Sequence, residues 1–168
     1  MYFFAQLRCA VDFPFPLEAG HAIFQGMKRL AAAILLAVLP LQAADLWSTD
    51  HEASLKKAAA EKRLLLLEFT GSDWCPPCRV QAREVFDQPG FAKFAEDNLV
   101  PVKLDFPRKS SQSAETQAAN QALAEKYSVE GFPTVILLDS RGTELARKVG
   151  YGGGGVEAFI SWVEKNKK

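Results

Sequence analysis

The hydrophobic positions of residues 44–168 change their spacing several times along the chain. Two segments rich in apolar residues have strand length, Leu64–Phe69 and Val100–Phe106, and the first is typical of a central strand covered on both faces. A third apolar segment, Thr134–Leu138, is followed by turn residues at Asp139–Gly142 and then by Glu144–Val149. That order predicts two strands joined as a β-hairpin.

Helical patterns occupy the segments between and after these strands. Asp50 is a suitable N-cap for the first helix, because its carboxylate can accept backbone N–H groups of the first turn. The predicted helices cover His51–Lys62, Cys78–Val85, Phe91–Glu96, Ala114–Tyr127 and Val156–Lys165, with loops at Pro107–Ser113 and Gly150–Gly155. Helices that alternate with strands and end in a hairpin and a helix predict an α/β domain, with a central mixed β-sheet flanked by helices on both faces.

The segment from Met27 has the three-part layout of a secretory signal peptide. A basic pair is followed by ten uninterrupted apolar residues, Leu30–Leu39, and then by small residues at Ala43 and Ala44. A transmembrane anchor and an N-terminal core helix are the alternatives. Ten apolar residues fall short of the roughly 20 that span a bilayer, and the run has no polar position to face water. We therefore expect cleavage after Ala43 or Ala44 and no stable membrane anchor.

Residues 1–26 precede this segment and show no clear hydrophobic period. Because a signal peptide belongs at the start of a chain, we expect translation to begin at Met27; an unusually long leading region is the alternative. The expected organisation is an upstream extension at 1–26, a signal peptide at 27–43 and one domain at 44–168. Export implies a periplasmic or secreted protein in an oxidising compartment.

Charge and cysteine count narrow the functional classes. The chain has 20 Lys and Arg against 20 Asp and Glu, which leaves no basic excess for a phosphate backbone, so nucleic acid is not an expected partner. Three cysteines are too few for a disulfide scaffold. Removal of the leading segments also removes Cys9 and His21, which leaves Cys75, Cys78 and His51 as the Cys and His residues of the mature chain. We expect that chain to be a monomer.

The candidate chemistry lies in the sequence Trp-Cys-Pro-Pro-Cys at 74–78. On a strand-to-helix turn, unpaired backbone N–H groups and the helix dipole favour a cysteine thiolate, and a second cysteine about one turn further can bond to the first. Zinc is an alternative use of this spacing, but zinc takes four ligands and His51 is the one further candidate. A purely structural disulfide across so short a loop would stabilise little. We expect redox cycling of Cys75 and Cys78, with no metal.

Further features, taken with this motif, resemble the thioredoxin family. The family pattern is an apolar strand with an acidic residue, the W-C-x-x-C motif, a strand with a buried lysine, a cis-proline followed by threonine, and then a hairpin and a terminal helix. The matching positions here are Glu68, Cys75, Cys78, Lys103, Gly131-Phe132-Pro133-Thr134, Val135–Leu138 and Lys148-Val149-Gly150. The resemblance covers nearly all of residues 44–168 and implies a thioredoxin fold. It is strongest to exported bacterial members with Gly-Ser-Asp-Trp-Cys at the motif.

The resemblance and the chemistry of thiols together imply catalytic roles. Cys75 would attack a substrate disulfide as a thiolate, and the more buried Cys78 would resolve the mixed disulfide. Glu68, with a pKa raised by burial, would accept the proton of Cys78, and Lys103 on the adjacent strand would pair with Glu68. Solvated surface charges are the alternative for Glu68 and Lys103, but the leucines around them favour burial.

Substrate contacts are expected at Trp74, Phe132, Pro133 and Thr134. A cis Pro133 would bring backbone groups beside the sulfurs, where an extended substrate strand could bind. Without the resemblance, a trans proline at the start of a strand would be the expectation. Trp74 and Phe132 would form an apolar rim, with a place in the core as the alternative.

Two features depart from the family pattern. Glu68 lies seven residues before Cys75, one more than in ordinary thioredoxins, where the acid is usually Asp. The chain also has more residues between the motif and Pro133, which should enlarge the regions Phe86–Phe91 and Phe106–Glu115 and could reshape the substrate surface.

The expected function is that of an exported thiol–disulfide oxidoreductase that needs no cofactor, because the cysteines carry the electrons. Its partners would be protein thiols and disulfides, together with an upstream electron donor that the sequence does not name. We expect the reducing direction. A thioredoxin-like binding or chaperone module with an incidental CxxC, and a redox-regulated zinc module, are the alternatives; insulin reduction and elemental analysis would separate them.

Overall fold

The computed structural model describes residues 46–167, so the expected extension at 1–26 and signal peptide at 27–43 lie outside the described residues. Within that range the strands are β1 (Leu64–Thr70), β2 (Leu99–Asp105), β3 (Thr134–Leu138) and β4 (Glu144–Val149). The helices are α2 (His51–Glu61), α3 (Pro76–Gln81), the π-helical η1 (Ala82–Phe86), α4 (Pro89–Asn98), α5 (Ala114–Lys126) and α6 (Gly155–Asn166). None of these helices is long and apolar enough to cross a bilayer.

The strands form one mixed sheet in the order β2-β1-β3-β4. β1 runs parallel to β2 and antiparallel to β3, and β3 pairs with β4 as the predicted hairpin. The register aligns one residue from each strand in a row across the sheet, namely Lys103, Glu68, Val135 and Lys148. Two of the predicted site residues, Glu68 and Lys103, are therefore direct neighbours on adjacent strands.

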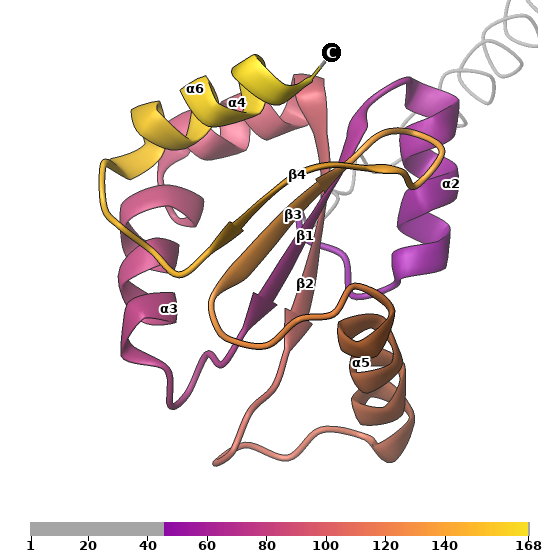
Figure 1. The fold of residues 1–168 in the computed structure, drawn as a ribbon, viewed down its shortest axis with the longest axis vertical. Coiled ribbons are helices and arrows are strands. Elements are labelled where there is room, and N and C mark those ends of the chain that lie inside the picture. The colour runs from indigo at the N-terminus through magenta and orange to yellow at the C-terminus, as the bar shows by residue number, and fades with distance from the viewer. Residues whose placement is uncertain (1–45, 168) are drawn as a thin grey trace, which may run out of the picture. The chain divides into compact units, whose positions relative to one another are not determined.

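Helices cover both faces of this sheet, which confirms the predicted architecture (Figure 1). α2 and α5 pack on one face, against Leu65, Leu67 and Phe69 of β1. η1, α4 and α6 pack on the other face against Leu66, and α3 leads into η1 on that side (Figure 1). Because residues two apart in a strand share a face, Glu68 belongs to the same face as Leu66, the side that carries the cysteine helix.

The segment before α2 covers the outer edge of the sheet. Ser48 donates its N–H to the Pro101 carbonyl at 3.0 Å and accepts the N–H of Lys103 at 2.8 Å, so it extends the ladder beyond β2. Trp47 then stacks on Phe91, with ring centres 5.7 Å apart. An edge strand presents unpaired backbone groups, and this segment satisfies some of them. The hydrophobic pattern predicted no element here.

The start of α3 differs from the expectation. The helix was predicted to begin at Cys78, but it begins at Pro76 and continues through η1 to Phe86. Proline is well suited to the first helical positions, because the N–H it lacks would have no partner there and its φ already matches the helix. α4 likewise begins earlier than predicted, at Pro89, and ends later, at Asn98. The bounds of the other helices and strands agree with the prediction to within one residue at either end.

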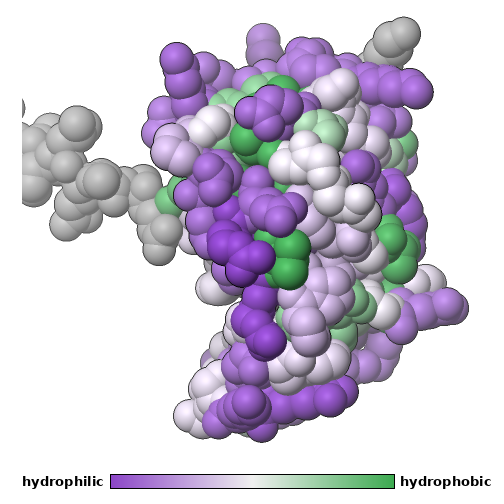
Figure 2. Space-filling model, turned by 90° about the vertical axis from the view of Figure 1, so that its left-hand side faces the viewer, coloured by the Kyte–Doolittle hydropathy of each residue, from purple (hydrophilic) through white to green (hydrophobic). Residues whose placement is uncertain are grey.

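The surface on the α3 and α6 side is mainly hydrophilic. Figure 2 views the molecule from the left-hand side of Figure 1, and there hydrophobic side chains form small, separate patches among hydrophilic ones. This face presents no broad apolar surface, so we expect a site on this side to bind its partner through contacts with a few individual side chains.

Candidate active site

The two motif cysteines form a disulfide at the start of α3. Their sulfurs are 2.02 Å apart, and Cys75 and Cys78 are 3% and 1% exposed. Cys75 is the N-cap of the helix, and its sulfur accepts the backbone N–H of Cys78 at 3.3 Å. The chain leaves β1 through a turn in which the Gly71 carbonyl accepts the N–H groups of Trp74 and Cys75. The redox pair thus lies at a helix N-terminus, as the motif predicted.

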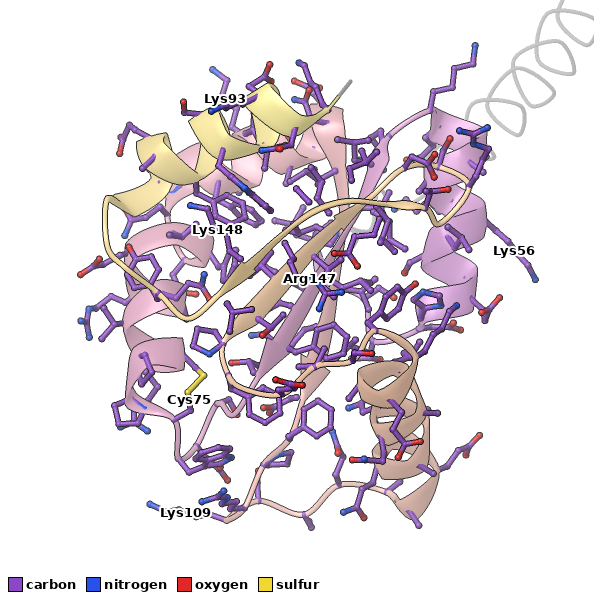
Figure 3. All side chains as sticks on the ribbon, viewed as in Figure 1. Lys56, Cys75, Lys93, Lys109, Arg147 and Lys148 are labelled. Carbon is purple, nitrogen blue, oxygen red and sulfur yellow. A yellow bond between two sulfur atoms is a disulfide. The ribbon has the colours of Figure 1, made fainter. Side chains whose placement is uncertain are left out.

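A cis-proline lies in the loop that leads into β3. The Phe132–Pro133 peptide bond is cis, as the resemblance implies, and Pro133 is buried. The Thr134 hydroxyl donates to the Gly131 carbonyl at 2.8 Å, and the Pro133 carbonyl accepts the N–H of Gly150 at 2.7 Å. Figure 3 shows the disulfide at Cys75 between α3 and this loop. The loop before β3 and the chain after β4 are therefore tied together on the side of the sulfurs.

Aromatic side chains line the same end of the molecule. Trp74 and Phe132 are both half-buried and meet edge to face, with ring centres 5.9 Å apart. The ring centres of Phe106 and Phe132 are 5.0 Å apart, and the Phe106 carbonyl accepts the indole N–H of Trp74 at 2.7 Å. The structure thus places Trp74 and Phe132, the two residues expected to form an apolar rim, in contact with each other. Phe106 is a third member, which the hydrophobic pattern had placed at the end of a strand.

Two residues that sequence reasoning missed hold the Trp74 indole. A Cβ atom at Gly71 would lie 2.5 Å from the ring, so the absence of a side chain there lets the indole rest on the backbone. The Arg108 guanidinium carbon lies 3.6 Å from the ring centre, in a cation–π contact. A glycine before the motif and an arginine in a polar loop are too common to have indicated this arrangement.

Asp73 binds the loop that follows β2. Its carboxylate accepts three successive backbone N–H groups, from Arg108 at 3.0 Å, Lys109 at 2.7 Å and Ser110 at 2.9 Å. These hydrogen bonds stabilise the charged carboxylate, with the bond from Arg108 the largest cause, and lower the pKa of Asp73 to about 2. Asp73 therefore serves as an anionic anchor for residues 108–110 beside the motif.

Glu68 is a buried carboxylate on the face of the sheet that carries the cysteine helix. Its side chain is 1% exposed, and its Oε2 has no hydrogen-bond partner among the described residues. Lys103, its neighbour on β2, holds Nζ 4.0 Å from that oxygen and is 39% exposed. The Lys103 ammonium also lies 5.5 Å from the centre of the Trp47 ring. The structure thus brings the two predicted residues together, with the acid buried and the base half in water.

Burial is the main reason that the pKa of Glu68 is raised to about 7. The Lys103 charge lowers the pKa, and so opposes the effect of burial, while the charge of Asp105 raises it further. A carboxyl group that titrates near neutrality can exchange a proton in either direction at physiological pH. The group has the property needed to accept a proton from a buried thiol.

His51, the remaining candidate for a zinc site, lies on α2, which covers the opposite face of the sheet from α3. Its Nε2 is 3.2 Å from the Tyr127 hydroxyl, and its Nδ1 is 3.3 Å from the Glu52 carboxylate. Burial is the largest cause of the lowered pKa of His51. The histidine therefore belongs to a contact between α2 and the end of α5, away from the cysteines.

Comparison with known proteins identifies the same family. A family model for the thioredoxin-like domain matches residues 51–166. The disulfide bond reductase DsbH of Chlamydia pneumoniae is 33% identical to the chain, with 84% of each protein covered. The thioredoxin-related protein DsbJ of the same organism is 31% identical over 75% of this chain but only 38% of its own length.

Solved structures agree with these relatives. A structure of DsbH oxidoreductase aligns with a TM-score of 0.67 and 34% identity, covering 76% of this chain and 88% of the other. A thioredoxin from Thermus thermophilus, with 22% identity and a TM-score of 0.53 over 71% of this chain and 84% of the other, shares the fold. With a Cys75–Cys78 pair in CxxC spacing on this scaffold, the chain belongs to the thioredoxin-like family and is a thiol–disulfide oxidoreductase.

Proposed function

We propose that this oxidoreductase reduces disulfide bonds in exported protein substrates, working as a monomer that cycles Cys75 and Cys78 between dithiol and disulfide. The observation that carries the proposal is the position of the pair, at the N-terminus of α3 and facing the cis-proline loop. An extended substrate segment could bind along that loop, with Trp74, Phe132, Pro133 and Thr134 as its contacts. The name of the relative DsbH, a disulfide bond reductase, supports the same direction.

In the first step, the Cys75 thiolate of the reduced protein attacks one sulfur of the substrate disulfide. A bond forms between Cys75 and that sulfur, the substrate disulfide breaks, and the second substrate sulfur leaves as a thiolate that takes a proton from water. One N–H, from Cys78, points at the Cys75 sulfur and stabilises its negative charge.

In the second step, Cys78 resolves the mixed disulfide. Its thiol gives a proton to the Glu68 carboxylate, and the resulting thiolate attacks the Cys75 sulfur. The bond between Cys75 and the substrate breaks, the substrate leaves as its second thiol after taking up a proton, and the Cys75–Cys78 disulfide remains. Two electrons have moved from the protein to the substrate, and an external dithiol donor must return them. The support for Glu68 is its burial and its pKa of about 7; Lys103 tunes that pKa.

The environment of Cys75 favours a reductant. A strong oxidant stabilises its reduced form by holding the thiolate with N–H groups and positive charge. Here Pro76 and Pro77 occupy the first two helical positions and have no N–H, and among residues 46–167 the one backbone hydrogen bond to the Cys75 sulfur comes from Cys78. We therefore expect a reduction potential nearer the roughly −270 mV of thioredoxin than the roughly −120 mV of the strong oxidant DsbA.

Equilibration of the protein with glutathione redox buffers, read by thiol alkylation and mass, measures this potential. A Pro77→His variant is the matched comparison, since it restores an N–H and adds a titratable group beside Cys75, and its potential should be less negative than that of the wild type. A wild-type value above about −150 mV would overturn the reducing direction and favour a disulfide-forming role.

We also propose that the protein acts after export, as residues 44–168, once the segments 1–26 and 27–43 have been removed. The support is the basic, apolar and small-residue layout that starts at Met27. The intact mass of the exported protein is expected to correspond to a chain that begins at Ala44 or Asp45, and export should persist when residues 1–26 are deleted. A mature form that retains Cys9 would contradict this proposal.

A further inference from the structure

The segment 106–110, which follows β2, is attached to the cysteine motif at several points. Asp73, two residues before Cys75, accepts the three N–H groups of residues 108–110. Trp74, adjacent to Cys75, donates its indole N–H to the Phe106 carbonyl. Ser72 donates its N–H and hydroxyl to Asp105 at 2.9 and 2.6 Å, just before the segment begins. These bonds lie at the surface and add little to the core, so their consequence is the placement of residues 106–110 beside the disulfide.

Arg108 is the side chain whose position these bonds determine most directly. Its guanidinium carbon lies over the Trp74 indole, 3.6 Å from the ring centre, and the residue is exposed. No carboxylate among residues 46–167 pairs with it. Stacking leaves the N–H edge of the guanidinium free, and that planar edge matches a carboxylate through two parallel hydrogen bonds. The Arg108 guanidinium therefore lies beside Trp74, the residue before Cys75, and can form hydrogen bonds with a bound molecule.

The charges around the disulfide favour an anionic partner. The nearby carboxylates Asp73 and Asp105 already accept several hydrogen bonds from the protein itself. Arg108 and Lys109 are exposed on the segment, and Figure 3 shows Lys109 at the same end of the molecule as Cys75. Arg79, on α3, is also exposed, and Glu130 is the exposed carboxylate before the cis-proline loop. Apart from the two hydrogen-bonded aspartates, the exposed charged side chains named here are therefore mostly cationic.

We propose that Arg108, supported by Lys109, is a specificity-determining contact that selects protein substrates with an acidic side chain next to the reactive cysteine. This inference rests on the proposed function and names the substrate class of the same site. When the substrate cysteine lies over Cys75, the side chain of a flanking residue falls on the Trp74 side, where the Arg108 edge can bind its carboxylate. Because the guanidinium is already stacked, little side-chain freedom is lost when the pair forms.

Three peptides test this selection. Each carries one cysteine linked through a disulfide to the same neutral reporter thiol, and the residues flanking the cysteine are Glu, Gln or Lys. The rate constant for attack by the fully reduced protein is measured for each peptide by reporter release. Each value is divided by the rate with dithiothreitol, which removes differences in the intrinsic reactivity of the peptides.

We expect the wild type to prefer the Glu peptide over the Gln peptide by about fivefold, the size of a single exposed charge pair of ~1 kcal/mol. The Lys peptide should be slower than both, and high salt should reduce the preference. Arg108→Gln should bring the Glu-to-Gln ratio to near 1. Lys93→Gln removes one positive charge on α4, which Figure 3 shows far from the disulfide, and should keep the wild-type ratio.

The outcomes separate this inference from the proposed function. A wild type that reduces all three peptides at similar normalised rates, or an Arg108→Gln variant that keeps the full ratio, overturns the selection by Arg108 and leaves the proposed function standing. A wild type that reduces none of the peptides overturns the proposed function, and the selection with it.

Discussion

Replacing Cys78 with alanine is expected to stop turnover and to leave the protein covalently joined to its substrate through Cys75. The first attack needs only the Cys75 thiolate, so the mixed disulfide still forms. Its release needs a thiolate at position 78, and without that group the adduct persists. Turnover should fall on the order of a thousandfold or more, as expected when one member of a catalytic pair is removed.

Insulin reduction in the presence of dithiothreitol measures the turnover, and intact mass under non-reducing conditions detects the adduct. The matched control is Cys75→Ala, which should lose turnover without forming an adduct. If Cys75→Ala accumulated an adduct and Cys78→Ala did not, the two roles would be reversed. The contact between the Cys78 N–H and the Cys75 sulfur favours Cys75 as the attacking residue.

Much of the fold was predictable from the spacing of apolar residues. The hairpin strands Thr134–Leu138 and Glu144–Val149 have the predicted bounds, because a short apolar run, a turn at Asp139–Gly142 and an alternating run admit few other structures. The start of α3 was not predicted, because the rule that disfavours a helical residue before proline competes with the suitability of proline for the first turn. At Pro76 the second effect prevails.

The candidate site was predictable where a local motif specifies it. The spacing of Cys75 and Cys78 predicts their disulfide, and the family resemblance predicts the cis bond before Pro133. The neighbouring positions of Glu68 and Lys103 depend on the register of two parallel strands, which no local pattern encodes.

The contact of Arg108 with Trp74 could not be predicted from the sequence either. It depends on the loop conformation that Asp73 imposes by accepting three N–H groups, and the sequence shows only a polar stretch there. Gln81 is a further case. It lies on the buried side of α3, one turn beyond Cys78, and its Oε1 has no partner among the described residues. Amphipathic spacing alone would have placed an apolar residue at such a position.

Replacing Glu68 with glutamine is expected to stabilise the oxidised protein above neutral pH and to remove a pH dependence of its stability. In the folded protein the pKa of Glu68 is about 7, against 4.5 without the fold. Between these values the folded state holds a proton at Glu68 that the unfolded state has lost, so the contribution of Glu68 to the stability of the wild type falls as the pH rises from about 4.5 to about 7 and then levels off.

The size of the effect follows from the same interval. At about 1.4 kcal/mol per pH unit, the difference between the two pKa values makes the free energy of unfolding of the variant ~3 kcal/mol larger than that of the wild type above pH 7. Glutamine carries no charge at any of these pH values, so the variant lacks this contribution and should equal the wild type in stability only near pH 4. Other groups that titrate in this range, such as His51 with its lowered pKa, affect both proteins alike, so the difference between the two curves is the measure. Urea unfolding of the oxidised protein from pH 4 to 8 measures both curves. Glu96→Gln, which removes an exposed carboxylate on α4, should follow the wild-type curve.

The same substitution should impair the second step of the reaction. Glutamine cannot accept a proton from Cys78, so release of the mixed disulfide should slow on the order of a hundredfold, the usual contribution of a general base, while attack by Cys75 changes little. Stopped-flow measurement of the two steps with one peptide disulfide separates them. Equal slowing of both steps, or no slowing, would show that Glu68 is not the proton acceptor. A variant that is more stable and slower to release its substrate would show that the buried charge is kept for the reaction, at a cost to the stability of the fold.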